Sequence, residues 1–261
     1  MQRIILLASL FIYQVLSPNG AFSLQETKNI QKNNEIVILT YNVRNCRGQD
    51  NRIDYQRVAD IINRINPEVV ALQELDSSTL RSGKIIVLDE LALRTRLFPT
   101  FGASIAYQGG KYGIGILSKE KPIWWKSIAL PGREEIRSLL IIEFKDFLFC
   151  STHFSLNEED RLKSVEIIND HFSKYSKPVF LAGDLNAVPE SNVIKNIETK
   201  WQMLNNPADP TIPADNPNRC IDYIFVLKNN KNYFSVGQST VEKEPVASDH
   251  LPVWVKIRID K

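Results

Sequence analysis

Five short polar segments, each beside an apolar run, carry the residue types that could do chemistry in this chain. They are Tyr41-Asn42, Gln73-Glu74, Thr152-His153, Gly183-Asp184-Leu185-Asn186 and Ser248-Asp249-His250. A run such as Val179-Phe180-Leu181-Ala182 is typical of a buried strand, so side chains that follow it emerge at a sheet edge, where one pocket can collect them. We expect a cluster of carboxylates, amides and imidazoles that suits a hard metal ion and a phosphate.

Three carboxylates at the ends of apolar runs, Glu74, Asp184 and Asp249, predict a metal site. Each acid alone is more often a helix cap or a salt-bridge partner. Together they would place unpaired charges at buried positions, where a divalent cation offsets the cost. Oxygen ligands with an amide such as Asn42 or Asn186 suit Mg²⁺ or Mn²⁺ rather than zinc.

The histidines differ in their surroundings. A lone histidine such as His153 is more often a structural hydrogen bonder than a catalyst, and His171, on a polar helix, fits that description. His250 follows Asp249 directly, and Asp222 offers a carboxylate that could fix its tautomer. We therefore expect His250 to contribute to chemistry.

Arg137 is a candidate phosphate ligand, because a planar guanidinium can hold two phosphate oxygens. An ion pair with Glu134 or Glu135 is an equally good interpretation of the same residue. A phosphoester hydrolase needs a metal, a base for water and donors for the developing charge, and the segments contain candidates for each.

The elements that position these residues alternate between strands and helices. Ile36 to Tyr41 is β-branched and predicts a strand that leads directly into Asn42. A helix capped by Asp54 follows, with an apolar face that repeats at helical spacing, and Asn66-Pro67 ends it before a strand at Val69 to Leu72.

The remainder of the chain predicts further strands and two more helices. Asn157 caps one helix, and the other follows Ser191 and extends to Trp201. The Pro-rich segment 207–217 predicts a loop. The further strands are expected at 103–107, 113–118, 138–144, 147–152, 179–182, 221–226, 234–240 and 252–258. This order favours one mixed α/β domain with helices outside stacked sheets.

The composition is that of an ordinary globular protein, with 261 residues of which 43% are apolar. A net charge of +2 argues against a protein that grips nucleic acid through a broadly basic surface. Cys46, Cys150 and Cys220 are too few and too scattered for a disulfide framework or a zinc site. Cys150 lies in an apolar run and is expected to be buried.

The N-terminus has the pattern of a secretory signal. Arg3 precedes a mainly apolar stretch from Ile4 to Leu16, and small residues follow at Asn19-Gly20-Ala21. The stretch is shorter than the roughly 20 residues that a membrane-spanning helix needs. We predict a signal peptide at 1–21, a flexible segment at 22–34, a domain at 35–261, and a secreted or periplasmic protein; a membrane anchor is the weaker alternative.

These motifs resemble those of the endonuclease/exonuclease/phosphatase superfamily, which includes DNase I, abasic-site endonucleases, neutral sphingomyelinases and inositol polyphosphate 5-phosphatases. The resemblance spans nearly all of residues 36–258, and its motifs occur in the family's order. They are Thr40-Tyr41-Asn42-Val43, Leu72-Gln73-Glu74, Gly115-Ile116-Leu117-Ser118, Ser151-Thr152-His153, Gly183-Asp184-Leu185-Asn186, Ile221-Asp222-Tyr223 and Ser248-Asp249-His250.

The resemblance implies a four-layer α/β/β/α sandwich of two mixed β-sheets flanked by helices, with the site at one edge of the paired sheets. It implies that Glu74, with Asn42 and Asp249 nearby, holds Mg²⁺, with Mn²⁺ as an alternative. Asp184 would orient or deprotonate the attacking water, and Asn186 would hold the phosphate.

The resemblance also gives roles to the two histidines. His250, supported by Asp222, would contact or protonate a phosphate oxygen, and His153 would stabilise the pentacovalent transition state. The family's arginine motif is matched only loosely by Arg137, with Arg133 as a rival, and no carboxylate that would orient His153 is identifiable. The presence of His153 makes the chain similar to the DNase I, sphingomyelinase and 5-phosphatase branches.

Three substrate classes follow from the resemblance. The first is a phosphodiester in nucleic acid. The second is a lipid headgroup, for which Trp124-Trp125 could dip into an interface, although core or hairpin packing is the favoured interpretation of these tryptophans. The third is a sugar or inositol phosphate. A non-catalytic binding module is the fourth and weakest reading. We expect a monomer with no obligate protein partner.

Overall fold

The computed structural model describes residues 35–228 and 233–260. The predicted signal peptide at 1–21 and the predicted segment at 22–34 lie outside the described residues. Among the residues that are described, no helix has both the length and the apolar composition needed to cross a bilayer.

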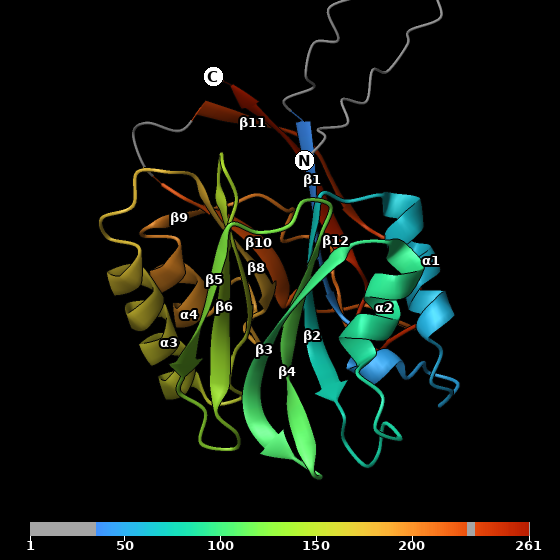
Figure 1. The fold of residues 1–261 in the computed structure, drawn as a ribbon. Helices are drawn as coiled ribbons and strands as arrows, with labels where there is room; N and C mark the ends of the chain where they lie inside the picture. The colour runs from blue at the N-terminus through green and yellow to red at the C-terminus, as the bar shows by residue number, and fades with distance from the viewer. Residues whose placement is uncertain (1–34, 229–232, 261) are drawn as a thin grey trace, which may run out of the picture. The chain divides into compact units, whose positions relative to one another are not determined.

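Two mixed β-sheets form the centre of the domain (Figure 1). In spatial order, the first contains β11 (Tyr233–Val241), β12 (Val253–Asp260), β1 (Glu35–Asn42), β2 (Val69–Ser77), β4 (Gly110–Ser118) and β3 (Phe98–Tyr107). The second contains β5 (Trp124–Leu130), β6 (Arg137–Glu143), β7 (Leu148–His153), β8 (Val179–Asp184), β10 (Asp222–Leu227) and β9 (Trp201–Met203). One pair in each sheet is parallel, β1 with β2 and β7 with β8.

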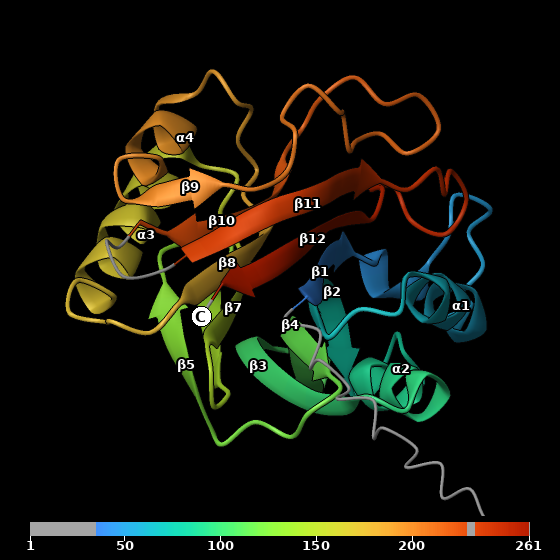
Figure 2. The same cartoon turned by 90° about the horizontal axis from the view of Figure 1, so that it is seen from above.

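Helices cover the outer face of each sheet, which gives four layers (Figures 1 and 2). The helices α1 (Tyr55–Ile65) and α2 (Val87–Thr95) share a core with β1 and β2. The helices α3 (Glu158–His171) and α4 (Asn192–Ile197) share another core with the second sheet. A third core fills the space between the sheets. The predicted α/β/β/α sandwich is confirmed.

The central strands are buried on both faces, which explains their continuous apolar sequences. Along β8, Leu181 points into the core beneath α3 and α4, whereas Phe180 points into the core between the sheets. Along β1, Ile38 and Leu39 divide in the same way between the inter-sheet core and the core beneath α1. Residues just past these strands are the first to leave the apolar interior, and the polar motifs stand there.

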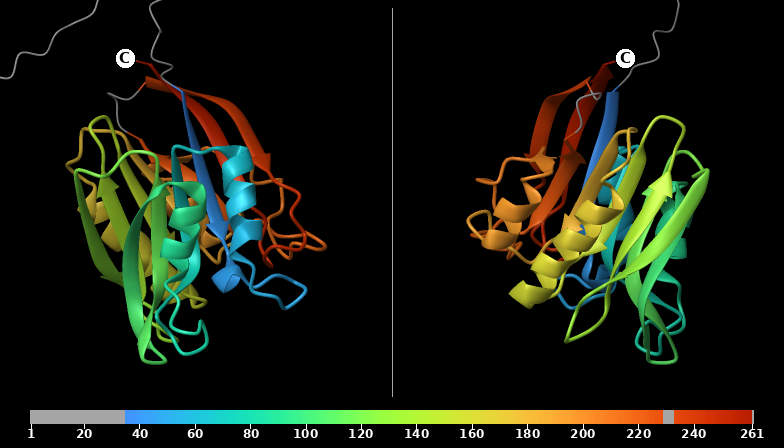
Figure 3. Two further views of the ribbon diagram at one scale, coloured as in Figure 1. Left: turned by 45° about the vertical axis from the view of Figure 1, so that its right-hand side comes forward. Right: turned by 90° about the vertical axis from the view of Figure 1, so that its left-hand side faces the viewer.

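The sequence signals for α1 act as expected. The Asp54 carboxylate accepts a hydrogen bond from the Arg57 N–H at 2.9 Å and caps the helix. Asn66 adopts a left-handed conformation with φ of 54° and ends it. The chain can then turn back into β2, parallel to β1, and Figure 3 shows α1 packed beside this strand pair.

Several predictions of secondary structure were incomplete or wrong. The helix α2 and the strand β5 were not predicted, and β3 begins at Phe98 rather than at 103. The helix after Ser191 does not extend to Trp201, because α4 ends at Ile197 and Trp201 opens β9. Trp201 is nevertheless fully buried, and its indole N–H donates to Asn169 Oδ1 of α3 at 2.9 Å.

Candidate active site

The predicted site residues gather where the two parallel strand pairs end. Asn42 is the last residue of β1, and His153 and Asp184 are the last residues of β7 and β8. His153 and Asp184 are also partners in the sheet register. Because the carboxyl ends of parallel strands meet at one edge, the two sheets present these side chains to a common space.

Asn42 joins two of the predicted carboxylates. Its Nδ2 donates to Glu74 Oε1 and to Asp184 Oδ2, both at 3.1 Å, and its Oδ1 accepts from the Arg44 N–H at 3.1 Å. The side chain is fully buried. Both ends of the amide are therefore engaged, and the orientation of Asn42 is fixed.

Glu74 stands at an irregularity of β2. The register of β2 with β4 shifts between Leu72 and Leu75, and Glu74 has a φ of 60°, a left-handed conformation that a non-glycine residue adopts at a cost of about 1–3 kcal/mol. Burial and the charges of Asp249 and Asp184 raise the pKa of the Glu74 carboxyl, while the Asn42 hydrogen bond lowers it. A cation bound to this carboxylate would offset the repulsion from Asp249 and Asp184 and so lower the pKa of Glu74.

Asp184 lies at the centre of the cluster and is buried. Its Oδ1 accepts from the Asn186 N–H at 2.9 Å. Its Oδ2 lies 3.4 Å from His153 Nε2 and 3.6 Å from His250 Nε2. Asp184 is therefore a carboxylate partner of His153, which the sequence did not identify.

His250 is oriented by Asp222, as the sequence suggested. His250 Nδ1 lies 2.9 Å from Asp222 Oδ2, and the Thr211 hydroxyl donates to the same oxygen at 2.6 Å. Burial acts to lower the pKa of His250, but the negative charges of Asp222 and Asp184 outweigh it and raise the pKa to about 10. The imidazole is therefore charged at neutral pH.

His153 has the opposite charge state. Burial lowers its pKa to about 4; Asp184 opposes this shift and the positive charge of Arg137 adds to it. A neutral and a charged imidazole thus face the same Asp184 oxygen, a separation of pKa values that is typical of groups with different roles in proton transfer.

Asn186 and Asp249 complete the predicted set, and each is already held by neighbours. The Asn186 amide donates to the Phe154 carbonyl at 3.0 Å, which leaves its second N–H available. Asp249 Oδ1 accepts from the Ser248 hydroxyl at 3.2 Å, and its Oδ2 lies 3.6 Å from Arg44 Nε. Asp249 is only partly buried, so solvent reaches this side of the cluster.

Arg137 is buried at the start of β6 and forms two ion pairs. Its guanidinium lies 3.0 Å from Glu134 Oε1 and 2.8 Å from Glu135 Oε1. Its Nε is buried without a hydrogen-bond partner among the described residues. The rival, Arg133, is exposed and pairs with Glu159 and Asp160 of α3.

Two sets of residues could hold a divalent cation. One ligand atom each from Asp184, Asp222 and His250 lies within 4.8 Å of the other two. Yet Asp222 Oδ2 is already bonded to His250 and Thr211, so this set is better described as a hydrogen-bond network. The carboxylates of Glu74 and Asp249, beside the Asn42 amide, offer the oxygen donors that Mg²⁺ prefers.

The sequence did not point to Thr211 or Arg44, and it named Glu134 only as an ion-pair partner of Arg137, a contact that the structure contains. Thr211 lies in the Pro-rich loop and is fully buried, and Arg44 follows a strand. Glu134 accepts from the Leu156 N–H and the Ser155 hydroxyl, both at 2.8 Å, while pairing with Arg137. Apart from the ion pair with Arg137, these contacts join segments that are not adjacent in the chain, and no local pattern predicts them.

The chain is similar to a known protein family and to several solved structures. The model of the family described as Endonuclease/Exonuclease/phosphatase matches residues 39–250. No curated protein sequence matches the chain.

Several solved structures have a similar fold. An endonuclease/exonuclease/phosphatase from Beutenbergia cavernae gives a TM-score of 0.72 at 23% identity, over 86% of this chain and 72% of that one. An endonuclease/exonuclease/phosphatase from Bacteroides vulgatus gives a TM-score of 0.71 at 19% identity, over 87% of this chain and 99% of that one. A mannosyl-6-phosphatase from Bacteroides thetaiotaomicron gives a TM-score of 0.65 at 18% identity, over 85% of this chain and 99% of that one. At sequence identities this low, the comparisons show that these proteins share the fold of this chain and nothing more.

Proposed function

This chain belongs to the endonuclease/exonuclease/phosphatase family, and on that premise we propose that it is a divalent-metal-dependent phosphoester hydrolase. One observation carries the proposal. The buried Asn42 amide links Glu74 to Asp184, and Asp184 in turn faces both imidazoles, so metal-binding, base and acid candidates share one connected network.

Glu74 and Asp249, with Asn42, are the proposed ligands of Mg²⁺, with Mn²⁺ as the alternative. When bound, such a cation neutralises phosphate charge and makes water more acidic. Their donor chemistry supports this assignment, because burial and the two neighbouring carboxylates, Asp249 and Asp184, raise the pKa of Glu74, and a cation would relieve the repulsion among the three acids.

The remaining roles follow from charge and hydrogen bonding. Asp184 orients the attacking water and accepts its proton, and Asn186 donates its second N–H to the phosphate. His250, charged and held by Asp222, donates to a phosphate oxygen, and neutral His153 donates to the oxygen that gains charge in the transition state.

Arg137 is a proposed phosphate ligand that acts from its ion pairs with Glu134 and Glu135. Because both terminal nitrogens already contact carboxylates, the side chain is held in place before any substrate arrives. A pre-oriented guanidinium loses little conformational entropy when it binds an anion.

A phosphodiester is the first substrate class that we propose. A phosphomonoester is the second, and the fold shared with a mannosyl-6-phosphatase favours it. The lipid class has less support. Trp124 and Trp125 are exposed, but they open β5, whose other end, Leu130, pairs with Arg137. Six residues of strand separate Trp124 from that end, or about 20 Å.

Export through the N-terminal segment is a proposal from the sequence alone. Expression of the full chain in a secreting host, followed by sequencing of the N-terminus of the exported protein, tests it. A start near residue 22 is expected, and retention of the whole chain inside the cell would contradict it.

A substrate panel with Mg²⁺ or with EDTA tests the enzymatic function. We would compare bis-p-nitrophenyl phosphate, p-nitrophenyl phosphate, plasmid DNA, RNA, sphingomyelin and hexose phosphates. At least one should be hydrolysed in Mg²⁺ and not in EDTA, and Asp184→Ala should abolish that turnover. EDTA-insensitive turnover, or turnover of none, would contradict the proposal.

A further inference from the structure

Tyr112 of β4 lies beside the end of β2 that carries Glu74, and no step described above uses it. In the sheet register it pairs with Asp76, two residues after Glu74, and on its other side with Ile105 of β3. Side chains alternate between the faces of a strand, so Tyr112 is on the same face of β4 as Ile114, which contributes to the core between the sheets. The Tyr112 ring therefore faces the second sheet.

The two sheets are joined close to Tyr112. Ser104 of β3 precedes Ile105, which pairs with Tyr112. The Ser104 hydroxyl lies 2.7 Å from the Ser138 hydroxyl of β6, and Ser138 directly follows Arg137. This contact across the sheets brings the start of β6, and with it the proposed phosphate ligand Arg137, close to Tyr112.

The electrostatic surroundings of the Tyr112 hydroxyl agree with this position. Burial and the negative charges of Glu74 and Glu135 raise its pKa above the ordinary value, and the positive charges of Arg137 and Arg81 oppose the shift. The hydroxyl thus interacts with a proposed metal ligand on its own sheet and with a proposed phosphate ligand on the other. It keeps its proton at neutral pH and can act as an uncharged hydrogen-bond donor.

The Tyr112 ring is held by Arg81, which lies in the loop after β2. The guanidinium is 5.4 Å from the ring centroid of Tyr112 and 4.7 Å from that of Tyr107, distances at which a cation is attracted to an aromatic face. Arg81 Nε and Nη2 donate to the two carboxylate oxygens of Asp76 at 2.7 and 2.9 Å. Because Asp76 is fully buried, this ion pair fixes the guanidinium against the two rings.

The loop that carries Arg81 is itself attached to the turn between β3 and β4. The Arg81 N–H donates to Gln108 Oε1 at 2.9 Å, and the Leu80 N–H donates to the Gln108 carbonyl at 3.0 Å. A Cβ at Gly110 would clash with the Ser77 carbonyl, so the turn and the end of β2 are in close contact. These contacts set the orientation of the Tyr112 ring before any substrate binds.

A phosphate beside Arg137 needs donors that bring no further negative charge. Arg137 is paired with both Glu134 and Glu135, so its side of the site carries more negative than positive charge. The Tyr112 hydroxyl makes no hydrogen bond with any residue that the structure describes, and its proton is available to a phosphate oxygen. A hydroxyl that donates to a charged acceptor forms one of the stronger hydrogen bonds in proteins.

We propose that Tyr112 is a further catalytic residue, whose hydroxyl donates to an oxygen of the substrate phosphate beside Glu74 and Arg137. Arg81, which holds the Tyr112 ring, is then a positioning residue. This inference rests on the proposed function, because it adds a donor to the same phosphate site. The hydroxyl keeps its proton throughout, and no covalent bond to Tyr112 forms.

Removal of the single hydroxyl tests the contact. Tyr112→Phe keeps the ring and its packing on Arg81, and it should lower kcat/KM for a p-nitrophenyl phosphate ester in Mg²⁺ at least about tenfold. Isothermal titration calorimetry in Mg²⁺ should show that the affinity for inorganic phosphate falls by a similar factor. The melting temperature and its rise in Mg²⁺ should stay unchanged, because Glu74 loses no contact.

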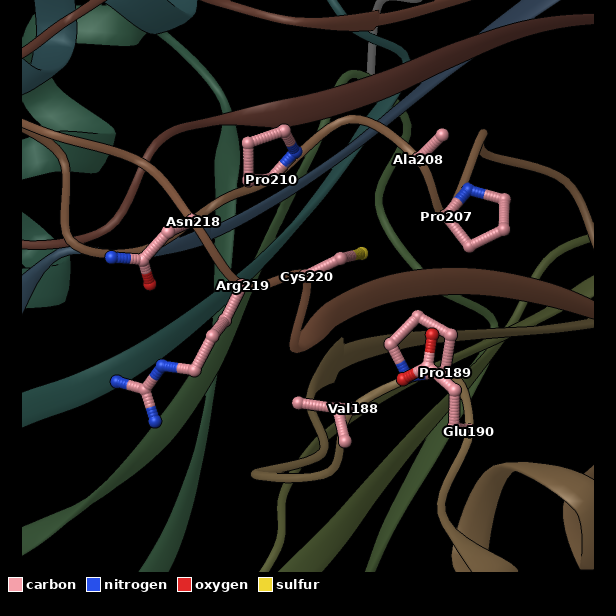
Figure 4. Close-up of a pocket in the computed structure, with 9 residues that line it drawn as sticks. All are labelled: Val188, Pro189, Glu190, Pro207, Ala208, Pro210, Asn218, Arg219 and Cys220. Atoms are coloured by element: carbon pink, nitrogen blue, oxygen red, sulfur yellow. The ribbon is translucent and has the colours of Figure 1, made fainter.

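Tyr107→Phe is the matched control. Tyr107 packs on the same guanidinium, but its hydroxyl accepts a hydrogen bond from the Gln108 side chain in the turn, at 3.3 Å. Asn218→Ala is a second control, which removes an exposed amide from the wall of a small cavity lined by the loops after β8 and before β10 (Figure 4). Both variants should keep kcat/KM and phosphate affinity within about twofold of wild type.

A double-mutant cycle tests whether Arg81 acts through Tyr112. Arg81→Lys keeps a positive charge for Asp76 but replaces the planar group that packs on the two rings. It should lower kcat/KM at least about threefold in the wild type and have no further effect in Tyr112→Phe. A purely structural role for Arg81 predicts equal losses in both backgrounds.

Wild-type kcat/KM or phosphate affinity in Tyr112→Phe would overturn the inference, and so would equal losses in Tyr112→Phe and Tyr107→Phe. Equal losses from Arg81→Lys in both backgrounds would overturn its positioning role. A wild type that hydrolyses no ester in Mg²⁺ would defeat the proposed function, and the calorimetric comparison would then decide the Tyr112 contact by itself. A wild type that also fails to bind phosphate would overturn both.

Discussion

Asn42 Nδ2 lies 3.1 Å from Asp184 Oδ2, so an amide at the end of β1 is hydrogen bonded to a carboxylate at the end of β8 in the other sheet. The same nitrogen reaches Glu74 at 3.1 Å. One side chain therefore sets the spacing between the proposed metal ligand and the proposed base.

Replacement of Asn42 should affect rate far more than folding. In Asn42→Ala the two carboxylates lose their common donor, and we expect kcat for a p-nitrophenyl ester to fall at least about 100-fold. Asn63→Ala removes a surface amide that donates to the Arg94 carbonyl at 3.3 Å, and it should keep full activity. Steady-state kinetics with circular dichroism provides the check; a folded Asn42→Ala enzyme with wild-type kcat would refute the role.

Mg²⁺ should raise the melting temperature of the wild type through Glu74. A ligand at 100 times its dissociation constant stabilises the folded state by about 2.7 kcal/mol. Glu74→Gln should abolish the Mg²⁺-dependent shift, while Glu143→Gln, at the far end of β6, should keep it. Differential scanning fluorimetry in EDTA and in Mg²⁺ measures both; equal shifts in all three proteins would contradict the assignment.

Thr211 should act as a positioning residue through Asp222. Its hydroxyl donates to Asp222 Oδ2 at 2.6 Å and accepts from the Ile221 N–H at 3.2 Å. Thr211→Val removes both bonds at nearly constant volume, and we expect kcat to fall roughly tenfold with little change in KM. Thr211→Ser should restore the rate. A purely structural role predicts instead that both variants lose stability and keep kcat.

The stability of the protein should depend on Glu134 at low pH. Burial acts to raise the pKa of this carboxyl, but hydrogen bonds from Leu156, Ser155 and Arg137 outweigh burial and hold the pKa at about 2, below the ordinary value of 4.5. Because the folded pKa is the lower one, the unfolded state binds more protons between these values, and the stabilisation is present above pH 4.5 and lost as pH falls toward 2.

Urea unfolding of the wild type and of Glu134→Gln across pH 6 to 2.5 measures this contribution. The difference in the free energy of unfolding should be constant above about pH 4.5 and shrink below it. A difference that stays constant throughout would show that the Glu134 carboxylate contributes nothing through its charge.

Substitution of the exposed tryptophans tests the lipid alternative. In a double variant, Trp124→Ser with Trp125→Ser, hydrolysis of soluble phosphate esters and of liposomal sphingomyelin should each stay within twofold of wild type. The reason is their position at the opposite end of β5 from Arg137. A selective loss on liposomes would instead favour a membrane-docking role.

The fold was predictable where a strand is buried on both faces or a helix has a clear cap. Strand β8 and helix α1 have these signals, and both were found. The strand β5 was missed because most of its side chains are exposed, so it lacks an alternating pattern. The helix α2 was missed because its N-cap, Ile86, makes no side-chain capping bond.

The site was predictable only in part, for a related reason. Asn42, Asp184 and His153 directly end apolar runs, and strand register alone brings them to one edge. Thr211 and Arg44 depend on how loops fold back onto the sheets. A buried threonine within a Pro-rich loop has the same local sequence as an exposed one, so only tertiary packing distinguishes them.

The two parallel strand pairs described above have a consequence for how activity responds to stress. Each sheet supplies part of the reaction centre, Asn42 and Glu74 from one and His153 and Asp184 from the other. The apolar layer between the sheets, to which Phe180 and Ala182 contribute, therefore acts as a spacer whose thickness sets the reacting distances. Heat or denaturant that loosens this layer should therefore abolish enzymatic activity before the individual sheets lose their hydrogen bonds.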